Sequence, residues 1–513
     1  MPLPVLNASQ AAEWDERARV ASRIPSRVLM EAAGRAVAQV LARDFPAALC
    51  EGVLLVAGHG NNGGDGWVAA RALRAGGARV CAVETDHERS ADCEANRALA
   101  LDEGVELLPA GRAWPSVGVA IDALLGTGAS GEPRGSIGEL AQRVAEYPGP
   151  VVAVDGPTGL DLSTGQAWGP CRATVTVTFG GVRRGHLLQR DWCGKVVIAD
   201  IGFPPSDPSW PVLMVDSEAA ALLPAFSASM HKGQRGHVVI IGGAEGMAGA
   251  ALHAASAAFA AGAGLVKIAA SQQTVQAAQA VHPDALTVTT ALGPECEPEL
   301  EEVIDWAHAV VLGPGLGRGE ERNRFVAAVL QRAGVPVVVD ADALHTGWEA
   351  LTSGDAPRVF TPHPGEFLDA FHEFAGQLKE DRFAAASAAA AAAGASAAST
   401  VLLKGVPTII AVRDRPLRVV ATGNPALATG GSGDLLSGFI AAFLARGIDP
   451  RDAAALGAFT LGRAAELAAA DLTVRSTRPA DVLAAVPELW RMLAVPRPFI
   501  PPVLFELPAP ALV

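Results

Sequence analysis

The chain of 513 residues is too long for a single hydrophobic core, so we expect at least two domains. Half of its residues are apolar and 18% are charged, a composition that is typical of folded globular proteins and argues against extensive disorder. The formal net charge of -14 argues against nucleic acid as a partner, although backbone amides and helix N-termini still allow an anionic small molecule to bind.

Cysteines and apolar segments together predict a cytoplasmic protein. The six cysteines include no C-x-x-C pair, so we predict neither a zinc site nor a disulfide framework. The N-terminus lacks the pattern of a signal peptide, and glycines and a lysine interrupt the apolar segment 254–270 before it reaches the length of a membrane span. We therefore expect no membrane partner, and we expect the chain to form a homo-oligomer.

The first half alternates short β-branched runs with helical patterns. The runs lie at residues 53–57, 78–83, 117–121 and 151–154. This rhythm predicts a parallel α/β sheet. A cluster of prolines between Phe203 and Pro211 has no helical period, so we place a domain boundary between this cluster and about Ala228.

The second half repeats the same rhythm. Its runs lie at 238–241, 265–268, 310–312, 337–339, 401–403 and 408–410. The alanine-rich segment 384–398 predicts a packed helix, because alanine is the best helix former. The fold class is therefore α/β, with two doubly wound, mainly parallel-sheet domains.

A glycine-rich loop follows the first predicted strand. Residues Gly58 to Gly66 read G-H-G-N-N-G-G-D-G, which contains the spacing G-x-G-x-x-G, and a helical pattern follows. Glu84 ends the next predicted strand, where a dinucleotide-binding fold places an acidic residue against a ribose hydroxyl. Taken alone, this pattern is also typical of a nicotinamide-dependent dehydrogenase, or of a turn that only packs a helix on a sheet.

Polar residues stand at two further strand ends. One strand leads into Asp122 and the G-T-G of residues 126–128, and the next leads into Asp155 and Thr158. Open parallel sheets bind their ligands at the carboxyl ends of the strands. We therefore expect these residues to meet the asparagines and the aspartate of the glycine-rich loop at one edge of the sheet.

The first half resembles the NAD(P)H-hydrate epimerase domain. Three motifs carry this resemblance: the glycine-rich loop, the strand end with G-T-G, and the D-x-P turn that follows the next strand. The similarity extends to residues 29–34, 176–179 and 194–202, and it predicts a Rossmann-like domain over residues 1–218. The resemblance implies that hydrated NADH or NADPH is bound by Asn61, Asn62, Gly63, Gly64, Asp65, Gly126, Thr127, Gly128 and Asp155. It also implies a potassium ion bound by Asn62, Asp122 and Thr158, whose oxygen atoms suit a hard monovalent ion.

Two positions depart from the family pattern. Thr158 replaces the usual serine but keeps the hydroxyl group. Arg183 and Arg184 stand where the family usually shows a lysine, and an arginine cannot give up a proton. Epimerisation needs a carboxylate that moves a proton or stabilises a cationic ring, and Asp155 is the candidate catalytic residue. The alternative is that Asp155 only caps the turn at Thr158.

Six segments of the second half carry glycines or charges beside a predicted strand or helix. They lie at residues 242–250, 313–317, 340–344, 361–367, 404–408 and 424–434. The last of them, ending in G-G-S-G-D, leads into an apolar helix whose first free amides predict an anion-binding site. Asp434 is suited to remove a proton from a substrate hydroxyl during phosphoryl transfer, unless it only caps that helix.

The G-x-G-D arrangement is similar to the ribokinase-like superfamily, and the six segments together resemble the ADP/ATP-dependent NAD(P)H-hydrate dehydratase within it. This resemblance predicts a ribokinase-like domain over residues 225–510. It implies nucleotide contacts from Lys404, Gly405, Val406, Pro407, Thr408 and Gly433. It further implies that Ala250, Gly317, His363 and Asp434 line the hydrated nicotinamide, that Asp434 is the catalytic base, and that magnesium bridges the phosphates of ADP or ATP.

Three alternatives stay open at this point. His363 stands between two prolines and is also suited to cap a turn. The G-x-G-D motif alone does not separate a dehydratase from a ribokinase-like kinase of a small alcohol or vitamin precursor fused to an NAD-binding domain. A third interpretation is a non-catalytic nucleotide sensor, which would keep its output after Asp434→Asn, whereas an enzyme would lose turnover.

Overall fold

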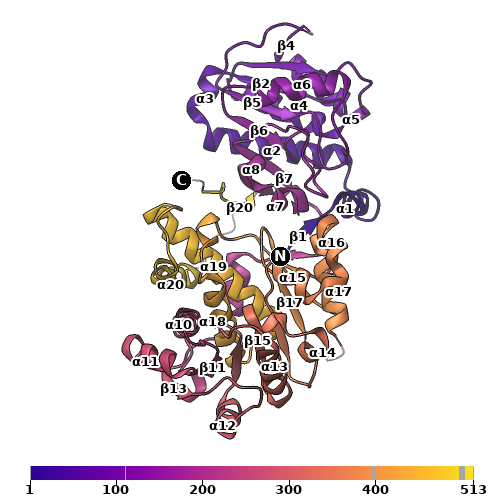
Figure 1. The fold of residues 1–513 in the computed structure, drawn as a ribbon. Helices are drawn as coiled ribbons and strands as arrows, with labels where there is room; N and C mark the ends of the chain where they lie inside the picture. Colours follow the sequence, from indigo (N-terminus) through magenta and orange to yellow (C-terminus); the bar gives the residue numbers. More distant parts are fainter. Residues whose placement is uncertain (1, 110, 395–398, 496–502, 512–513) are drawn as a thin grey trace. The chain divides into compact units, whose positions relative to one another are not determined.

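The computed structural model describes residues 2–109, 111–394, 399–495 and 503–511 (Figure 1). They form two compact units. The first holds the residues up to Trp210 together with the C-terminal strand β20 (Val503–Leu507), and the second runs from Pro211 through helix α20 (Pro479–Ala494). None of the helices within these ranges combines the length and the apolar character that a membrane span requires.

The first unit is built on a mainly parallel sheet with the strand order β20-β9-β7-β6-β5-β2-β3-β4. Its strands are β2 (Val53–Ala57), β3 (Val80–Glu84), β4 (Glu106–Leu107), β5 (Val119–Ala123), β6 (Val151–Val154), β7 (Val175–Phe179) and β9 (Lys195–Ala199), with β20 at one edge. The first unit also contains a short parallel pair, β1 (Leu3–Leu6) and β8 (Val182–Arg183). The described helices are α1 (Ala8–Val20), α2 (Ser26–Asp44), α3 (Pro46–Glu51), α4 (Asn61–Ala75), α5 (Ala91–Asp102), α6 (Gly135–Ala145), α7 (Arg184–Leu188) and α8 (Arg190–Cys193).

The central strands of this sheet are buried on both sides, because helices cover both of its faces. In β2, Val53, Leu55 and Ala57 pack into the core that α2 and α4 cover, whereas Leu54 and Val56 pack into the core that α6 covers. Successive side chains of a strand point to opposite faces, so a continuous apolar run needs a helix on each side. This is why the sequence of β2 shows no alternation.

Strand β20 pairs antiparallel with β9 and so adds a strand from the C-terminal end of the chain to the sheet of the first unit. The range 225–510 predicted for the second domain includes this strand. No motif in the sequence predicts the pairing, since it joins segments about 300 residues apart, whose partner choice depends on tertiary packing.

The second unit contains a larger sheet with the order β13-β12-β11-β14-β15-β16-β17-β18-β19-β10. Its strands are β10 (Val212–Leu213), β11 (His237–Ile241), β12 (Leu265–Ala270), β13 (Leu286–Thr289), β14 (Ala309–Leu312), β15 (Val337–Val339), β16 (Arg358–Phe360), β17 (Thr400–Leu403), β18 (Thr408–Val412) and β19 (Arg418–Val420). Strand β18 runs antiparallel to both of its neighbours, and the pairs from β13 through β17 are parallel.

Long helices flank this sheet on both sides (Figure 1). The α-helices are α9 (Asp216–Leu222), α10 (Ala248–Ala260), α11 (Gln272–Val281), α12 (Pro298–Trp306), α13 (Glu320–Arg332), α14 (Trp348–Leu351), α15 (Pro364–Ala370), α16 (Ala375–Glu380), α17 (Arg382–Ala393), α18 (Ser432–Ala445), α19 (Pro450–Leu472) and α20. Short 3-10 turns occur at Lys232–Arg235, Ala341–His345, His372–Phe374 and Pro425–Leu427. Helix α17 forms in the alanine-rich segment predicted over 384–398, of which residues 395–398 lie outside the described ranges.

Each sheet has a point where the strand order reverses direction. In the first unit the chain adds β3 on one side of β2 and β5 on the other, and in the second unit β12 and β14 flank β11 in the same way. The loops after such a central pair diverge and leave a crevice at the carboxyl ends of the strands. The glycine-rich loop and the G-T-G stretch follow β2 and β5, and Ala250 and Gly317 follow β11 and β14, whereas the other predicted site residues follow strands farther along each sheet or begin α18.

Candidate functional site

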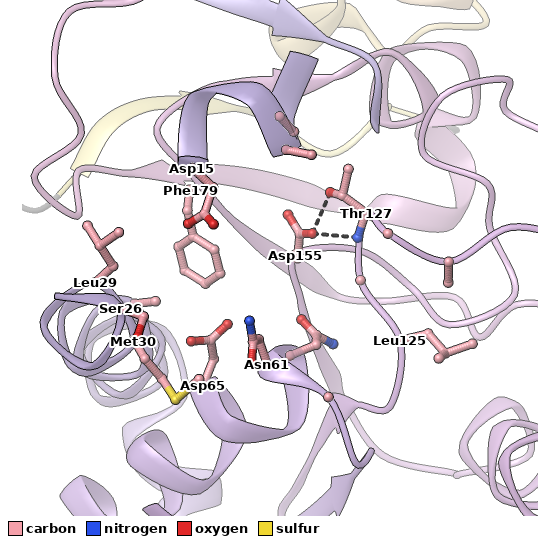
Figure 2. Close-up of a pocket in the computed structure, with 18 of the residues that line it drawn as sticks. Asp15, Ser26, Leu29, Met30, Asn61, Asp65, Leu125, Thr127, Asp155 and Phe179 are labelled. Atoms are coloured by element: carbon pink, nitrogen blue, oxygen red, sulfur yellow. Dashed lines mark hydrogen bonds between the residues drawn. The ribbon is translucent and has the colours of Figure 1, made fainter. Parts of the chain in front are cut away.

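The first unit has a cavity of about 700 Å³ beside the carboxyl ends of β2 and β5 (Figure 2). Asn61 and Asn62, at the start of α4, border it together with the G-T-G loop after β5. All of the predicted substrate-binding residues of this unit line the cavity except Gly63 and Gly64. A Cβ atom on Gly63 would lie 2.0 Å from the Gly58 carbonyl oxygen, so that glycine allows the helix to pack closely on the loop.

The acidic residue at the end of β3 does not face a ligand. Glu84 accepts hydrogen bonds from Arg97 at 2.7 and 2.9 Å and forms an ion pair with Arg89 at 2.9 Å. Its carboxylate is therefore occupied where a dinucleotide-binding dehydrogenase would use it for a ribose hydroxyl.

Asp155 points into the cavity and is held by several donors (Figure 2). Its Oδ2 accepts hydrogen bonds from the Thr127 amide at 2.7 Å and the Thr127 hydroxyl at 2.5 Å. Its Oδ1 accepts one from the Thr178 hydroxyl at 3.0 Å and lies 3.4 Å from a guanidinium nitrogen of Arg183. Burial acts to raise the pKa of Asp155, but the Arg183 charge and the Thr127 hydrogen bonds outweigh it and hold the pKa below its usual value.

The backbone of Asp155 is held in an uncommon conformation by a buried histidine. Asp155 has a φ of 64°, in the left-handed region that non-glycine residues rarely adopt. The Arg183 amide donates to His186 Nδ1 at 3.1 Å, which leaves the Nε2 hydrogen to donate to the Asp155 carbonyl oxygen at 2.7 Å. Burial lowers the pKa of His186 to about 4, so the ring is neutral and braces this residue without adding charge.

A second carboxyl group faces the same cavity. Asp65, on the first turns of α4, points toward the space that Asp155 and Asp15 also face (Figure 2). Within the described ranges, no hydrogen bond or ion pair reaches its side chain. Burial and then the charges of Asp155 and Asp15 raise the pKa of Asp65 well above its usual value. The cavity thus contains one carboxyl group whose surroundings lower its pKa and one whose surroundings raise it.

Asp122 and Thr158 form a polar pair at the ends of β5 and β6. Asp122 is fully buried and accepts hydrogen bonds from the Thr158 hydroxyl at 2.7 Å and the Thr158 amide at 2.8 Å. Burial raises the pKa of Asp122, and no cationic side chain of the described residues pairs with it. The Asn62 amide nitrogen is also buried without a hydrogen-bond partner in the described structure.

In the second unit, α18 begins with the predicted anion-binding sequence. Gly431 has a φ of 98°, which a glycine adopts without strain, and the helix starts at Ser432. Its first amides have no partner within the helix and leave a partial positive charge at this end. Asp434 lies in the first turn, and no hydrogen bond or ion pair with another described residue engages its side chain.

Lys404 places an ammonium group beside this helix terminus. A Cβ atom on Gly433 would lie 3.5 Å from Lys404 Nζ, so the glycine leaves room for it. Lys404 Nζ lies 3.1 Å from Asp340 Oδ1 and 3.4 Å from Glu366 Oε2. Burial alone would lower the pKa of Lys404, but these two carboxylates outweigh it and raise the pKa above its usual value.

Asp434 is surrounded by more negative than positive groups. Burial first, and then the charge of Asp340, raise the pKa of Asp434 to about 7, while Lys404 acts in the opposite direction. A carboxyl group with this pKa can take up and release a proton near neutral pH.

The predicted substrate residues of the second unit lie on neighbouring loops. The loop after β11 and the loop after β14 touch, because a Cβ atom on Gly242 would lie 2.2 Å from the Pro314 carbonyl oxygen. Gly317 donates its amide to Asp342 Oδ2 at 2.9 Å, and the Ala250 side chain lies beside Gly315. These loops follow the two strands at which the strand order reverses.

His363 is exposed and caps helix α15. Its Nδ1 accepts hydrogen bonds from the Gly365 amide at 3.0 Å and the Glu366 amide at 3.2 Å, and its Nε2 lies 3.5 Å from Glu366 Oε1. The capping role that the sequence left open is therefore present, and Glu366 Oε2 accepts from the His363 amide at 2.8 Å as well as lying 3.4 Å from Lys404 Nζ.

The predicted nucleotide loop, Lys404 to Thr408, joins β17 to β18. Arg382 donates hydrogen bonds to the carbonyl oxygens of Lys404 at 3.0 Å and Val406 at 3.1 Å. Gly405 has a φ of 140° and packs against this guanidinium group. Val406 is exposed at the surface of the loop.

Several residues of these sites were missed by sequence reasoning. Asp340 and Asp342 come at the end of a predicted strand, a position typical of site residues. Nothing in the sequence indicates that Asp340 pairs with Lys404. Arg382 carried no signal, since its target carbonyls lie more than 20 residues away. Asp15 and Phe179 line the first cavity but occur in ordinary helical and strand patterns.

Comparisons with known proteins agree with this division into two parts. A family model for NAD(P)H-hydrate dehydratase matches residues 238–488, and a model described as YjeF-related protein N-terminus matches residues 26–185. The chain is 35% identical over 518 residues to the bifunctional NAD(P)H-hydrate repair enzyme Nnr of Moorella thermoacetica, covering 95% of this chain and 97% of that relative. The chain belongs to the bifunctional NAD(P)H-hydrate repair enzyme family.

Members of this enzyme family from distant organisms match equally well. The Nnr enzyme of Pyrobaculum aerophilum is 36% identical over 506 residues, with 95% of this chain and 97% of the relative covered. The crystal structure of ADP/ATP-dependent NAD(P)H-hydrate dehydratase from Bacillus subtilis, co-crystallised with ATP and Mg²⁺, aligns with a TM-score of 0.50 and 30% identity over 54% of this chain and 97% of that chain. The predicted family and the predicted fold class, α/β with two mainly parallel sheets, are confirmed.

Proposed function

We propose that the chain repairs hydrated NADH and NADPH. One activity interconverts the R and S epimers, and the other converts the S epimer back to NAD(P)H at the expense of ADP or ATP. Relatives that match both halves over nearly their whole length support this proposal. Because dehydration accepts one epimer, epimerisation by the same chain allows the whole damaged pool to be repaired.

The two activities are assigned to the two predicted domains, residues 1–218 for epimerisation and 225–510 for dehydration. The matched family models lie inside these ranges. Strand β20 pairs in the first unit although its residues lie inside the second range, so a separately expressed first domain needs this strand to complete its sheet.

Asp434 is the proposed base for dehydration. Its carboxylate removes the proton of the substrate hydroxyl, whose oxygen attacks the terminal phosphorus of ADP or ATP, and AMP or ADP leaves. The new phosphate ester then loses phosphate from the ring carbon and a proton from the neighbouring carbon, which restores the dihydropyridine. Lys404 and the free amides of α18 balance the charge that develops on the transferred phosphoryl group.

The nucleotide is assigned to Lys404, Gly405, Val406, Pro407, Thr408 and Gly433, and the hydrated nicotinamide to Ala250, Gly317, His363 and Asp434. Magnesium in such sites is bound mainly by the phosphates, with few protein ligands. This agrees with the described residues, in which no group of three or more histidines, cysteines or acidic residues forms a metal site. When bound, the ion neutralises phosphate charge.

Asp155 is the proposed catalytic residue of epimerisation. Its fixed negative charge lies where a cationic ring would be stabilised as the ring carbon loses its configuration. Asn61, Asn62, Gly63, Gly64, Asp65, Gly126, Thr127 and Gly128 are assigned to the same substrate. Of these, Gly63 and Gly64 contribute through close packing of α4 rather than by lining the cavity.

A potassium ion at Asn62, Asp122 and Thr158 fits this site. The observation that supports it is the buried Asp122 carboxyl group, which lacks a cationic partner in the described structure. A monovalent cation would supply the missing charge and order the strand ends. Dialysis against lithium in place of potassium should lower epimerisation about tenfold while dehydration of the S epimer keeps its rate, as measured by following each epimer.

The observation that carries the proposal is Asp434 beside an ammonium group at a helix N-terminus, with its pKa near neutrality. The test is an assay of each purified hydrate epimer, with and without ADP or ATP, on the intact chain. Recovery of reduced-nicotinamide absorbance from the S epimer only with nucleotide, and from the R epimer after epimerisation, is expected. Accumulation of a phosphorylated alcohol without elimination would instead identify a small-molecule kinase.

The proposal places the enzyme in the cytoplasm, where its substrates form. All six cysteines are free, as is typical of a reducing compartment. The expected homo-oligomer stays a prediction, which light scattering of the purified chain would test.

A further inference from the structure

Asp340 is a buried carboxylate that connects three elements of the second unit. It follows β15 and is 1% exposed. Its Oδ1 lies 3.1 Å from Lys404 Nζ, at the end of β17, and accepts a hydrogen bond of 2.7 Å from the Thr361 hydroxyl, at the end of β16. Its Oδ2 accepts one of 2.6 Å from the Ser437 hydroxyl on α18. The carboxylate thus contacts one ammonium group and accepts from two hydroxyl groups.

The same carboxylate lies next to the anion-binding end of α18. A Cβ atom on Gly433 would lie 3.9 Å from Asp340 Oδ2 and 3.5 Å from Lys404 Nζ. Ser437 is one helical turn after Gly433, and its hydroxyl oxygen lies 3.2 Å from the Gly433 carbonyl oxygen. The first turn of α18 is therefore joined to the carboxylate that binds the ammonium group.

We propose that Asp340 is a positioning residue for phosphoryl transfer, which holds the Lys404 ammonium at the N-terminus of α18 and places a fixed negative charge beside Asp434. This inference rests on the proposed dehydratase function. Asp340 touches neither the reacting atoms nor a free surface, because its oxygens are occupied by protein donors. It acts through the two residues that do face the substrate and the nucleotide.

Four charged groups around Asp434 affect its pKa, and Asp340 is one of them. Asp340 and Asp342 come from the segment after β15, Glu366 from α15 and Lys404 from the end of β17. Among these, Asp340 has the largest effect in raising the pKa of Asp434, and Lys404 has the opposite effect. Removal of the Asp340 charge would also leave the Lys404 charge less compensated, so both consequences lower the pKa of Asp434.

The test is the pH profile of nucleotide-dependent dehydration of the S epimer by the full-length chain. For Asp340→Asn we expect the acidic limb to move down by roughly one pH unit, because a like charge is removed from beside the base. The plateau rate should fall at least tenfold, and the KM for nucleotide should rise, since Lys404 loses its main partner. For Lys404→Met we expect the acidic limb to move in the opposite direction, to higher pH.

Two conservative variants separate this role from a structural one. Asp340→Glu keeps the charge and should return the acidic limb to its wild-type position, and Ser437→Ala removes one hydrogen bond without moving the limb. An unchanged limb in Asp340→Asn, or limbs that move the same way in Asp340→Asn and Lys404→Met, would overturn the inference. If Asp340→Asn does not fold, the other two variants test the inference. A shift of the acidic limb to higher pH in Lys404→Met together with an unmoved limb in Ser437→Ala supports it, and any other result overturns it. A wild-type chain without dehydration would refute the proposed function instead.

Discussion

The two units each place a carboxyl group at a candidate site but surround it differently. Asp155 in the first unit directly follows β6, and Asp434 in the second unit lies in the first turn of α18. Asp155 receives hydrogen bonds from Thr127 and Thr178 and an ion pair from Arg183, which hold its pKa low. Asp434 has no such donor among the described residues, and burial with neighbouring carboxylates raises its pKa to about 7.

This contrast shows how one architecture serves two kinds of chemistry. A carboxylate with many donors is a fixed charge, suited to stabilise a cationic ring, whereas a carboxylate among like charges is a proton acceptor near neutrality. The surroundings rather than the fold determine which of the two a strand end provides. Variants that exchange or remove these surroundings should therefore affect one activity and not the other.

The largest expected effect is the loss of dehydration in Asp434→Asn. A general base typically contributes 10² to 10⁴ in rate, so we expect a fall of about 10³-fold in nucleotide-dependent recovery of NAD(P)H. Calorimetry should show that ADP or ATP still binds, because the amides of α18 and Lys404 remain. Epimerisation, measured by chiral separation of the two hydrates, serves as the internal control. Comparable losses in both activities would contradict the separation of the two sites.

The reciprocal variant, Asp155→Asn, should lower epimerisation by about 100-fold, since the fixed charge is removed while the shape of the site is kept. Dehydration of the purified S epimer should keep its rate, and the R epimer should remain unrepaired. Measurement on a mixture of epimers makes this visible as recovery that stops when the S form is used up. Complete recovery at the wild-type rate would exclude Asp155 from the reaction.

The two activities should also differ in their pH dependence. Asp434 has a raised pKa, so it becomes protonated as the pH falls through about 7, and dehydration should fall roughly tenfold per unit below that value. Asp155 has a lowered pKa and stays ionised there, so it adds no acidic limb to epimerisation. Rate measurements between about pH 5 and 8 on both epimers test the contrast. An acidic limb near 7 in epimerisation alone would reverse the assignment.

Much of this organisation could be predicted from the sequence. Buried parallel strands have continuous β-branched runs, so Asp122 and Asp155 could be placed at strand ends of the first sheet, and the glycines before Asp434 placed that residue at a helix N-terminus. What could not be predicted depends on contacts between distant segments. Lys404 and Asp340 are 64 residues apart, and Glu84, whose place in the sequence predicts a contact with a ribose hydroxyl, pairs with Arg97 instead. Local patterns carry no information about which charged groups meet.

Arg183 stands where the family usually shows a lysine, and substitution of this residue has the smallest expected effect. It tests most closely whether Asp155, unlike Asp434, is only a fixed charge. Arg183 donates to the Thr127 hydroxyl at 2.9 Å and the Gly181 carbonyl oxygen at 2.8 Å while its charge faces Asp155. Arg183→Lys keeps the charge but loses the planar set of donors, so Thr127 loses one partner and Asp155 keeps a neighbouring cation. We expect epimerisation to fall two- to fivefold, about 1 kcal/mol or less in the barrier, with dehydration unchanged.

The pH profile of Arg183→Lys decides between a cation that only holds Asp155 and one that also moves a proton. Unlike arginine, lysine can release a proton when its pKa is depressed by burial. If the rate of epimerisation rises and the profile gains a new limb on the alkaline side, a lysine at position 183 transfers a proton in the reaction. The arginine of this chain cannot make that contribution. If the rate falls slightly and the profile keeps its shape, the cation at position 183 only holds Asp155 in its ionised form. Asp155 is then a fixed charge, in contrast to Asp434, which takes up and releases a proton.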